Sequence, residues 1–204
     1  MSEIILTSNQ TKELDPMDAI TAITERVSVA QLTGPGPNQQ QLEQLYAAAF
    51  RAPDHAWMRP WRYLTIRGEG LSALGDVFVE AALKKNADLT EDKITKLRKK
   101  PQRAPLMIVA IANIQAHAKV PAVEQRLAVG AGIQNILTAA YAMELGAIWR
   151  TGEIVNDEHV RGALGLEENE EILGFIYLGH VNCKLKKPPV LAIEDYVQDW
   201  PLHT

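Results

Sequence analysis

Two arginines stand beside small hydroxyl residues at points where regular structure is expected to end. Arg26 is followed by Ser28, and Arg150 is followed directly by Thr151. A guanidinium offers a planar fork of donors and a hydroxyl adds a short neutral donor, so two such pairs could hold one dianionic phosphate. The alternative is that Arg26 only stabilises a helix end and Arg150 only pairs with an acid.

Other catalytic chemistry finds little support in the residue pattern. The histidines include no pair at the spacing that puts two imidazoles on one helix face, so a metal site is not expected: His55, His117, His159, His180 and His203. The single cysteine, Cys183, excludes an intrachain disulfide and is typical of a reducing cytoplasm. Neither a nucleophilic serine turn nor a glycine-rich phosphate loop is present. The sequence therefore names no catalytic residue.

The composition is that of one ordinary globular domain. The chain has 204 residues, of which 47% are hydrophobic and 23% charged, and its net charge is −4. The lysine-rich stretch 84–100 is interleaved with acids, so it predicts a solvated helix face rather than a nucleic-acid site. The first residues lack the cationic start and apolar segment of a signal peptide, which again favours the cytoplasm.

The elements that must position these residues come in blocks of helices and strands. Asp15 and Pro16 predict the start of a helix that ends near Glu25, and Asn38 caps a second. Strands are predicted at 61–67, 105–112, 147–149 and 172–178, with further helices at 71–82, after Thr90 and at 157–164. This order favours an α+β fold over a doubly wound parallel sheet. Residues 1–16 form an N-terminal arm, 17–180 the domain and 181–204 an extended tail.

The stretch 124–145 predicts a long helix that is apolar or small around most of its circumference. Such a helix is buried on all sides or lies in lipid. Four polar residues interrupt it, so a core helix is favoured over a membrane span, and small residues at 130–132 would let another helix approach closely. This helix leads directly to Trp149 and Arg150.

A set of short motifs resembles the nitroreductase family, and most of all its short bacterial NAD(P)H nitroreductases. The resemblance covers about residues 17–180 and rests on the combination and order of Arg26-Val-Ser28, Arg51-Ala-Pro-Asp-His55, Pro60-Trp61, Arg103-Ala-Pro105, Lys119-Val-Pro121 with Glu124-Gln125, and Trp149-Arg150-Thr151-Gly152. It implies a mainly antiparallel central sheet flanked by helices, with the long helix at the interface of a homodimer.

The resemblance also implies FMN as cofactor and NAD(P)H as electron donor, with FMN sites formed by both chains. Arg26, Val27 and Ser28 would hold the FMN phosphate and ribityl chain, and Trp149, Arg150 and Thr151 would add a second positive charge. Arg51 and His55 would reach the flavin from the partner subunit. A nicotinamide contact maps onto Ala139, Ala140, Tyr141, Ala142, Met143 and Glu144. The acceptor would be a small nitroaromatic or quinone-like molecule, reduced in a two-electron ping-pong reaction.

The sequence departs from the family pattern at three places. Thr151 replaces a serine and keeps its hydroxyl, whereas Val27 removes a charge that an arginine commonly supplies. Val123 stands where the short bacterial members tend to have tryptophan, which alters the expected acceptor pocket. The alternative function is therefore a flavin-binding storage or sensor module without efficient NAD(P)H turnover.

Overall fold

A computed structural model describes residues 17–200, so the expected arm at 1–16 and the last four residues lie outside it. The helices are α1 (Ala19–Glu25), α2 (Gln39–Ala49), α3 (Glu69–Lys85), α4 (Glu91–Arg98), α5 (Ala122–Ala142) and α6 (Glu158–Ala163). The strands are β1 (Leu32–Thr33), β2 (Trp61–Arg67), β3 (Leu106–Asn113), β4 (Leu145–Arg150) and β5 (Glu170–Val181). The order of elements confirms the predicted α+β class.

The five strands form one antiparallel sheet with β5 at its centre. The main path runs β1-β5-β3-β2, and β4 also pairs with β5. The strand β3 is buried along seven of its eight residues, as its unbroken apolar run predicts. It pairs with β2 and with β5, so the sheet is built around two buried strands.

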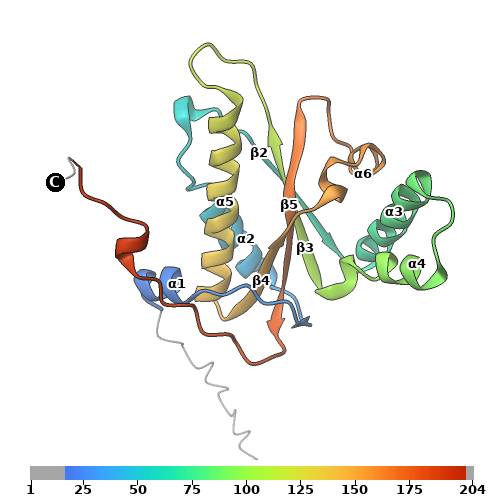
Figure 1. Ribbon diagram of the computed structural model, residues 1–204, viewed down its shortest axis with the longest axis horizontal. Helices are drawn as coiled ribbons and strands as arrows, with labels where there is room; N and C mark the ends of the chain where they lie inside the picture. The colour runs from blue at the N-terminus through green and yellow to red at the C-terminus, as the bar shows by residue number, and fades with distance from the viewer. Residues whose placement is uncertain (1–16, 201–204) are drawn as a thin grey trace, which may run out of the picture.

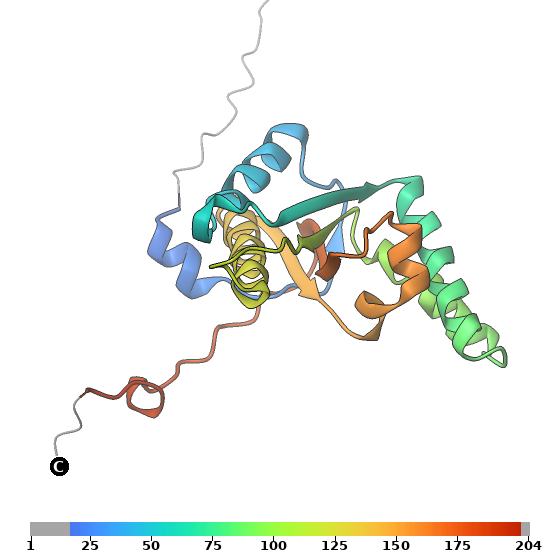
Figure 2. The same ribbon diagram turned by 90° about the horizontal axis from the view of Figure 1, so that it is seen from above.

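Helices cover both faces of the sheet (Figures 1 and 2). On one face α2 and α5 pack against Leu106, Ile108 and Ile176, and on the other α3 and α6 enclose Met107, Val109 and Tyr177. The alternation of neighbouring strand residues between the two cores follows from the two-residue period of a strand. The result is a three-layer arrangement with α5 running along one face.

Local signals in the sequence account for most helix starts. Asn38 forms a capping box with Gln41, and Thr90 accepts a hydrogen bond from the backbone N–H of Lys93. The first helix differs from the prediction, because its N-cap is Asp18 rather than Asp15, which lies outside the described residues. The Asp18 carboxylate accepts from two backbone N–H groups, which Asp15 was expected to do.

The long helix α5 is shorter at its end than its apolar run suggests. It stops at Ala142, and Glu144 follows with a φ of 58°, a left-handed conformation that turns the chain into β4. The close approach expected at the small residues is intramolecular. A side chain at Gly132 would lie 2.6 Å from the Tyr63 hydroxyl and 3.3 Å from the carbonyl oxygen of Ala49 at the end of α2. Gly132 therefore lets α2 and β2 pack on α5.

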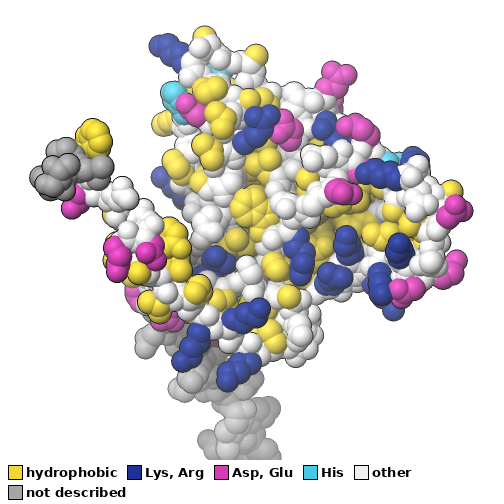
Figure 3. Space-filling view, viewed as in Figure 1, with side chains coloured by type: hydrophobic (Ala, Val, Ile, Leu, Met, Phe, Trp, Pro, Cys, Tyr) yellow, Lys and Arg dark blue, Asp and Glu magenta, His cyan; other side chains and the backbone are white. Residues whose placement is uncertain are grey.

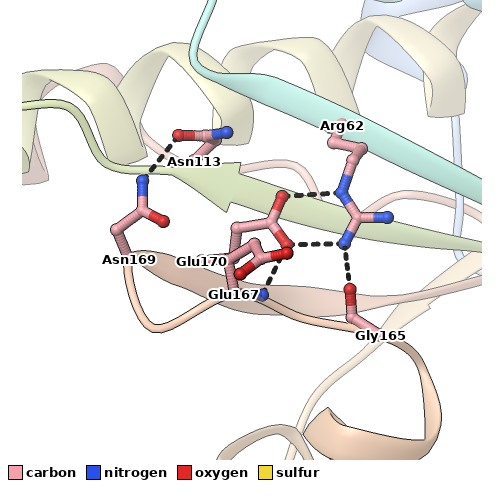
Figure 4. A network of polar contacts seen from close by, with 6 residues as sticks. All are labelled: Arg62, Asn113, Gly165, Glu167, Asn169 and Glu170. Carbon is pink, nitrogen blue, oxygen red and sulfur yellow. Dashed lines mark hydrogen bonds and ion pairs between the residues drawn. The ribbon is translucent and has the colours of Figure 1, made fainter.

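Two arginine–glutamate pairs fasten the start of β5. The Arg62 guanidinium on β2 donates to both Glu170 oxygens, at 2.6 and 2.5 Å, and also to the carbonyl of Gly165 (Figure 4). Arg126 on α5 donates to both oxygens of the next residue, Glu171, at 2.7 and 2.6 Å. Consecutive strand residues point to opposite faces, so β5 is tied to β2 and α5 at one point.

The chain beyond β5 leaves the body of the molecule as an extended tail (Figures 1 and 2). One 3₁₀ turn interrupts it at Ile193–Asp195. Its large apolar side chains are exposed: Leu185, Val190, Leu191, Ile193, Tyr196, Val197 and Trp200. Within the described part of the chain, none of the helices has the length and apolar character needed to cross a membrane.

Candidate functional site

The segment Arg26–Ser28 runs from the end of α1 along β4. Its position is fixed by the next residue, because the backbone N–H of Val29 donates to the carbonyl of Ala147 at 3.0 Å. Gly146 allows this approach, since a side chain there would lie 3.4 Å from the Cβ of Val29 and closer still to Leu32. The two arginine–hydroxyl motifs thus belong to neighbouring stretches of backbone.

Arg26 is half-buried, and two nitrogens of its guanidinium are buried without hydrogen-bond partners. Its Nε and Nη1 atoms are inaccessible to solvent, and neither has a partner among residues 17–200. A buried donor on a charged group that is left unpaired costs about 1–3 kcal/mol or more. These two atoms do not cap the helix, because they donate to no carbonyl of α1. A phosphate oxygen would satisfy them, and the Ser28 side chain stands exposed two residues on.

The Trp149 indole is seated by an irregularity in the neighbouring strand. The register of β3 and β5 shifts so that Leu173 is an extra residue, which leaves its carbonyl free of the ladder. That carbonyl accepts a hydrogen bond from Nε1 of Trp149 at 3.0 Å. Gly174 has a φ of 155° and makes room, since a Cβ there would meet Nε1 at 2.0 Å. The indole therefore has a fixed place.

The side chain of Arg150 points to the opposite face of the sheet from Trp149. Its guanidinium carbon lies 5.9 Å from the centre of the Tyr177 ring, a distance typical of a cation–π contact. Burial raises the pKa of the Tyr177 hydroxyl, and the positive charges of Arg150 and Arg103 partly oppose that rise. Arg150 has no carboxylate partner within ion-pair distance among residues 17–200, so the acid-pair alternative is not observed.

Arg150 and Thr151 line a hollow of about 370 Å³ with an apolar floor. Two further cations on its rim, Lys100 and Arg103, come from the turn before β3. Figure 3 shows dark blue side chains around an apolar hollow between the sheet and α4. Sequence reasoning gave Lys100 and Arg103 no role, although the motif Arg103-Ala-Pro105 was the available signal. Because the hollow is positive and partly aromatic, it suits a flat anionic ligand.

The two phosphate-binding candidates do not share this hollow. Arg26, Val27 and Ser28 are absent from its lining. The backbone contact between Val29 and Ala147 brings the motifs side by side, but the guanidinium of Arg150 turns toward Tyr177. A single clamp of both arginines on one phosphate is therefore not formed by these side chains as they lie.

His55 lies near the other end of α5, and Arg51 follows α2, whose last residues pack against the middle of α5. Figure 1 shows the turn that carries His55 beside the first residues of α5, whereas α1 lies beside its last residues. The helix has 21 residues, so its ends are about 30 Å apart. His55 bonds to Glu124 through Nδ1 at 2.6 Å, and Arg51 is exposed beside Phe50 and Trp57. One chain does not bring His55 to Arg26.

The stretch Ala139 to Glu144, mapped to nicotinamide, forms the last turn of α5 and the bend after it. Ala140 is completely buried, so its side chain is part of the core. Glu144 is the exposed residue of the set, and it occupies the left-handed bend. The described residues contain no group of three or more His, Cys, Asp or Glu side chains that could hold a metal ion.

Comparison with known proteins matches residues 23–180 to the model of the nitroreductase family. The Escherichia coli K12 protein named "Putative NAD(P)H nitroreductase YdjA" is 37% identical over 168 residues, which cover 82% of this chain and 91% of that protein. A nitroreductase-like family protein from Bacillus cereus has a similar structure, with a TM-score of 0.78 at 22% identity over 92% of this chain and 98% of that one. The Desulfovibrio desulfuricans protein described as "a putative nitroreductase in complex with fmn" has a TM-score of 0.69 at 23% identity, over 91% of this chain and 98% of that one.

Proposed function

The chain belongs to the nitroreductase family, and from that premise we propose that it is an FMN-dependent oxidoreductase with NAD(P)H as its donor. The proposed acceptors are small nitroaromatic or quinone-like molecules, each reduced by two electrons in a ping-pong reaction. The FMN complex among the similar structures and the name of the Escherichia coli relative support the cofactor and the donor. The exposed single cysteine, Cys183, fits a reducing compartment, and we place the enzyme in the cytoplasm.

The observation that carries the proposal is the pair of buried, unpartnered guanidinium nitrogens of Arg26, Nε and Nη1. A cation that is desolvated without a partner is destabilising in the free protein, and it gains charge-assisted hydrogen bonds when a phosphate arrives. Ser28 stands two residues on and adds a hydroxyl donor. The residues present therefore fit the phosphate and the neighbouring ribityl hydroxyls of FMN.

When bound, FMN supplies the redox chemistry, accepting hydride from reduced nicotinamide and giving two electrons to the acceptor. The protein's part is to bind, orient and set the local charge. Arg150, Lys100 and Arg103 surround one hollow with positive charge, which favours an anionic ligand there, and Thr151 adds a hydroxyl. On the opposite face of the sheet, the seat formed by Leu173 and Gly174 holds the Trp149 indole. We assign no acid or base.

The division of the candidate residues between the two ends of α5 supports a site made by two chains. His55 is about one helix length from Arg26 within a chain, so a partner has to supply it if it reaches the same flavin. We therefore propose a homodimer with α5 at its interface. The nicotinamide contact at Ala139 to Glu144 remains part of the proposal, with Glu144 as its exposed residue.

Exposed apolar side chains also support the homodimer. On α5, Val123 is 56% exposed and Leu127 is 67% exposed, and Ile20 and Ile23 on α1 are similarly uncovered. Large apolar groups gathered on a monomer surface mark interaction sites. The C-terminal tail adds seven more of them beyond β5. Burial of these side chains against a second copy would remove them from water.

Absorbance spectroscopy of the purified protein tests the proposed function. The protein, after incubation with FMN and removal of excess, should be yellow, and anaerobic NADH or NADPH should bleach the flavin band. A protein that takes up no FMN contradicts the proposal. Slow bleaching that is indifferent to the nucleotide would favour the storage or sensor alternative, so stopped-flow reduction with both nucleotides decides between the two functions.

A further inference from the structure

The loop that carries His55 has an unusual backbone. Three residues in it have positive φ angles although none is glycine: Ala56 at 57°, Trp57 at 56° and Arg59 at 46°. Non-glycine residues in the left-handed region cost free energy, and such strain persists only where surrounding contacts impose it. The loop is therefore held in shape by its neighbours.

Two sets of hydrogen bonds that do not involve His55 hold the loop in place. Within the loop, the backbone N–H of Arg59 donates to Oδ2 of Asp54 at 2.7 Å. From outside, Nε2 of Gln115 donates to the carbonyl of Met58 at 3.0 Å. The Gln115 backbone is bonded in turn to the buried side chain of Gln125 on α5, at 2.9 and 2.8 Å. These contacts tie the loop to the first turns of α5 without using an ionisable pair.

The contact between His55 and Glu124 is different in kind. Glu124 precedes Gln125 in the first turn of α5, and its Oε2 lies 2.6 Å from Nδ1 of His55. A carboxylate only accepts hydrogen bonds, so Nδ1 carries the hydrogen. In a neutral imidazole the other nitrogen, Nε2, then presents a lone pair. The His55 side chain is 53% exposed, and Nε2 has no partner among residues 17–200.

The pair also lies on a surface suited to a ligand. His55 and Glu124 line a hollow of about 600 Å³ against α5, together with Leu127, Ala128 and Ala131. The exposed apolar residue Leu127 belongs to the face that we assign to the dimer interface. An acceptor atom on this face can meet a hydroxyl or N–H group that the second copy carries.

We propose that Glu124 is a positioning residue. It fixes the orientation and the Nδ1–H tautomer of His55, so that Nε2 accepts a hydrogen bond from an O–H or N–H group of FMN bound in the partner subunit. This inference rests on the proposed function. The loop keeps its fold through Asp54 and Gln115, so the role of Glu124 is to select the state of the imidazole rather than to hold the backbone.

Imidazole NMR on the full-length protein tests the positioning step directly. The experiment records long-range ¹⁵N–¹H correlations of the His55 ring, assigned by their loss in His55→Asn. The wild-type ring should show the Nδ1–H pattern, and Glu124→Ala should shift it to the Nε2–H tautomer. Asp92→Ala, which breaks an exposed pair with Lys96 on α4, is the matched control and should leave the ring unchanged. An unchanged tautomer in Glu124→Ala overturns the positioning role.

FMN titration of the same variants tests the ligand step. Loss of one hydrogen bond of the neutral type should weaken FMN binding about tenfold in Glu124→Ala and by a similar factor in His55→Asn. His55→Asn keeps a donor for Glu124 but lacks the distal nitrogen, so its thermal midpoint should stay near that of the wild type. Full FMN affinity in both variants overturns the assignment of Nε2 to the flavin. A wild-type protein that binds no FMN at all instead contradicts the proposed function, while the tautomer measurement still reports on Glu124.

Discussion

The two arginines that bind the start of β5 differ from the arginine after α1 in the partners that the fold supplies. Arg62 and Arg126 each donate two hydrogen bonds to a carboxylate, on Glu170 and Glu171. Arg26 is as much a part of the interior, yet two of its nitrogens have no partner in the described chain. The first two guanidinium groups serve the fold, and the third is available to a ligand.

The carboxylates confirm this difference. The hydrogen bond from Arg62 holds the pKa of Glu170 below its ordinary value, and Arg126 does the same for Glu171. Both pairs are already complete within one chain, so they offer nothing to an anion. Residue type alone does not separate the three arginines, because only the partner that the fold supplies distinguishes a structural charge from a binding charge.

Removal of Arg62 should have the largest effect on stability. Arg62→Ala leaves the carboxylate of Glu170, which is 3% exposed, without its partner. Breaking one side of a buried pair typically costs about 3 kcal/mol or more of unfolding free energy. Urea unfolding at neutral pH measures this loss. Arg126→Ala is the matched control, because both members of the Arg126–Glu171 pair are partly exposed and the expected cost is below about 1 kcal/mol. Equal losses would abolish the distinction between the two pairs.

Removal of Arg26 should act on the ligand instead of the fold. Arg26→Ala should weaken FMN binding about 100-fold, because two charge-assisted hydrogen bonds are lost, while the apoprotein stays as stable as the wild type or gains slightly. Isothermal titration with FMN and urea unfolding of the apoprotein measure the two effects. A large loss of apoprotein stability with unchanged FMN affinity would place Arg26 with Arg62 and Arg126 and so remove the comparison.

Gly174→Ala should disturb the Trp149 indole, which belongs to the candidate binding motif but already donates its hydrogen bond to the Leu173 carbonyl. The added Cβ would fall 2.0 Å from Nε1 of Trp149, at a φ of 155° that alanine avoids, and should cost about 2 kcal/mol of unfolding free energy. The cost should be equal with and without FMN, unlike that of Arg26→Ala. Urea unfolding in both states tests this, and tryptophan fluorescence should report a more exposed indole. A loss confined to the FMN-bound state would contradict it.

Lowering the pH should have the smallest effect of these changes on the unfolding free energy. Because the folded state lowers the pKa of Glu170, this group contributes stability above the ordinary pKa of a glutamate, and the contribution disappears as the pH falls through the lowered value. Arg62→Ala should therefore lie closer to the wild type in unfolding free energy at pH 3 than at pH 7. Parallel unfolding curves at the two pH values measure this. A constant difference would show that the Arg62 pair contributes by packing alone.

Much of the fold could be predicted from local sequence. The unbroken apolar run of β3 and the cap residue Asn38 act over a few neighbouring residues, so the sequence determines them directly. The start of α1 shows the limit, since Asp18 and Asp15 both suit an N-cap and only the packed helix selects Asp18. The end of α5 was missed for a similar reason, because the left-handed bend at Glu144 is not an apolar-pattern signal.

The chain by itself determined the candidate motifs, the α+β class and the absence of a recognisable nucleophile or metal pattern, because these depend on residue type and short spacing. Tertiary structure alone decided which charges are free. It gave Arg62 a carboxylate 108 residues away, left two buried nitrogens of Arg26 without a partner, and set Lys100 and Arg103 beside Arg150. The physical reason is that an arginine is neutralised by whatever the fold places within hydrogen-bond distance, and partners so distant in sequence carry no local signal.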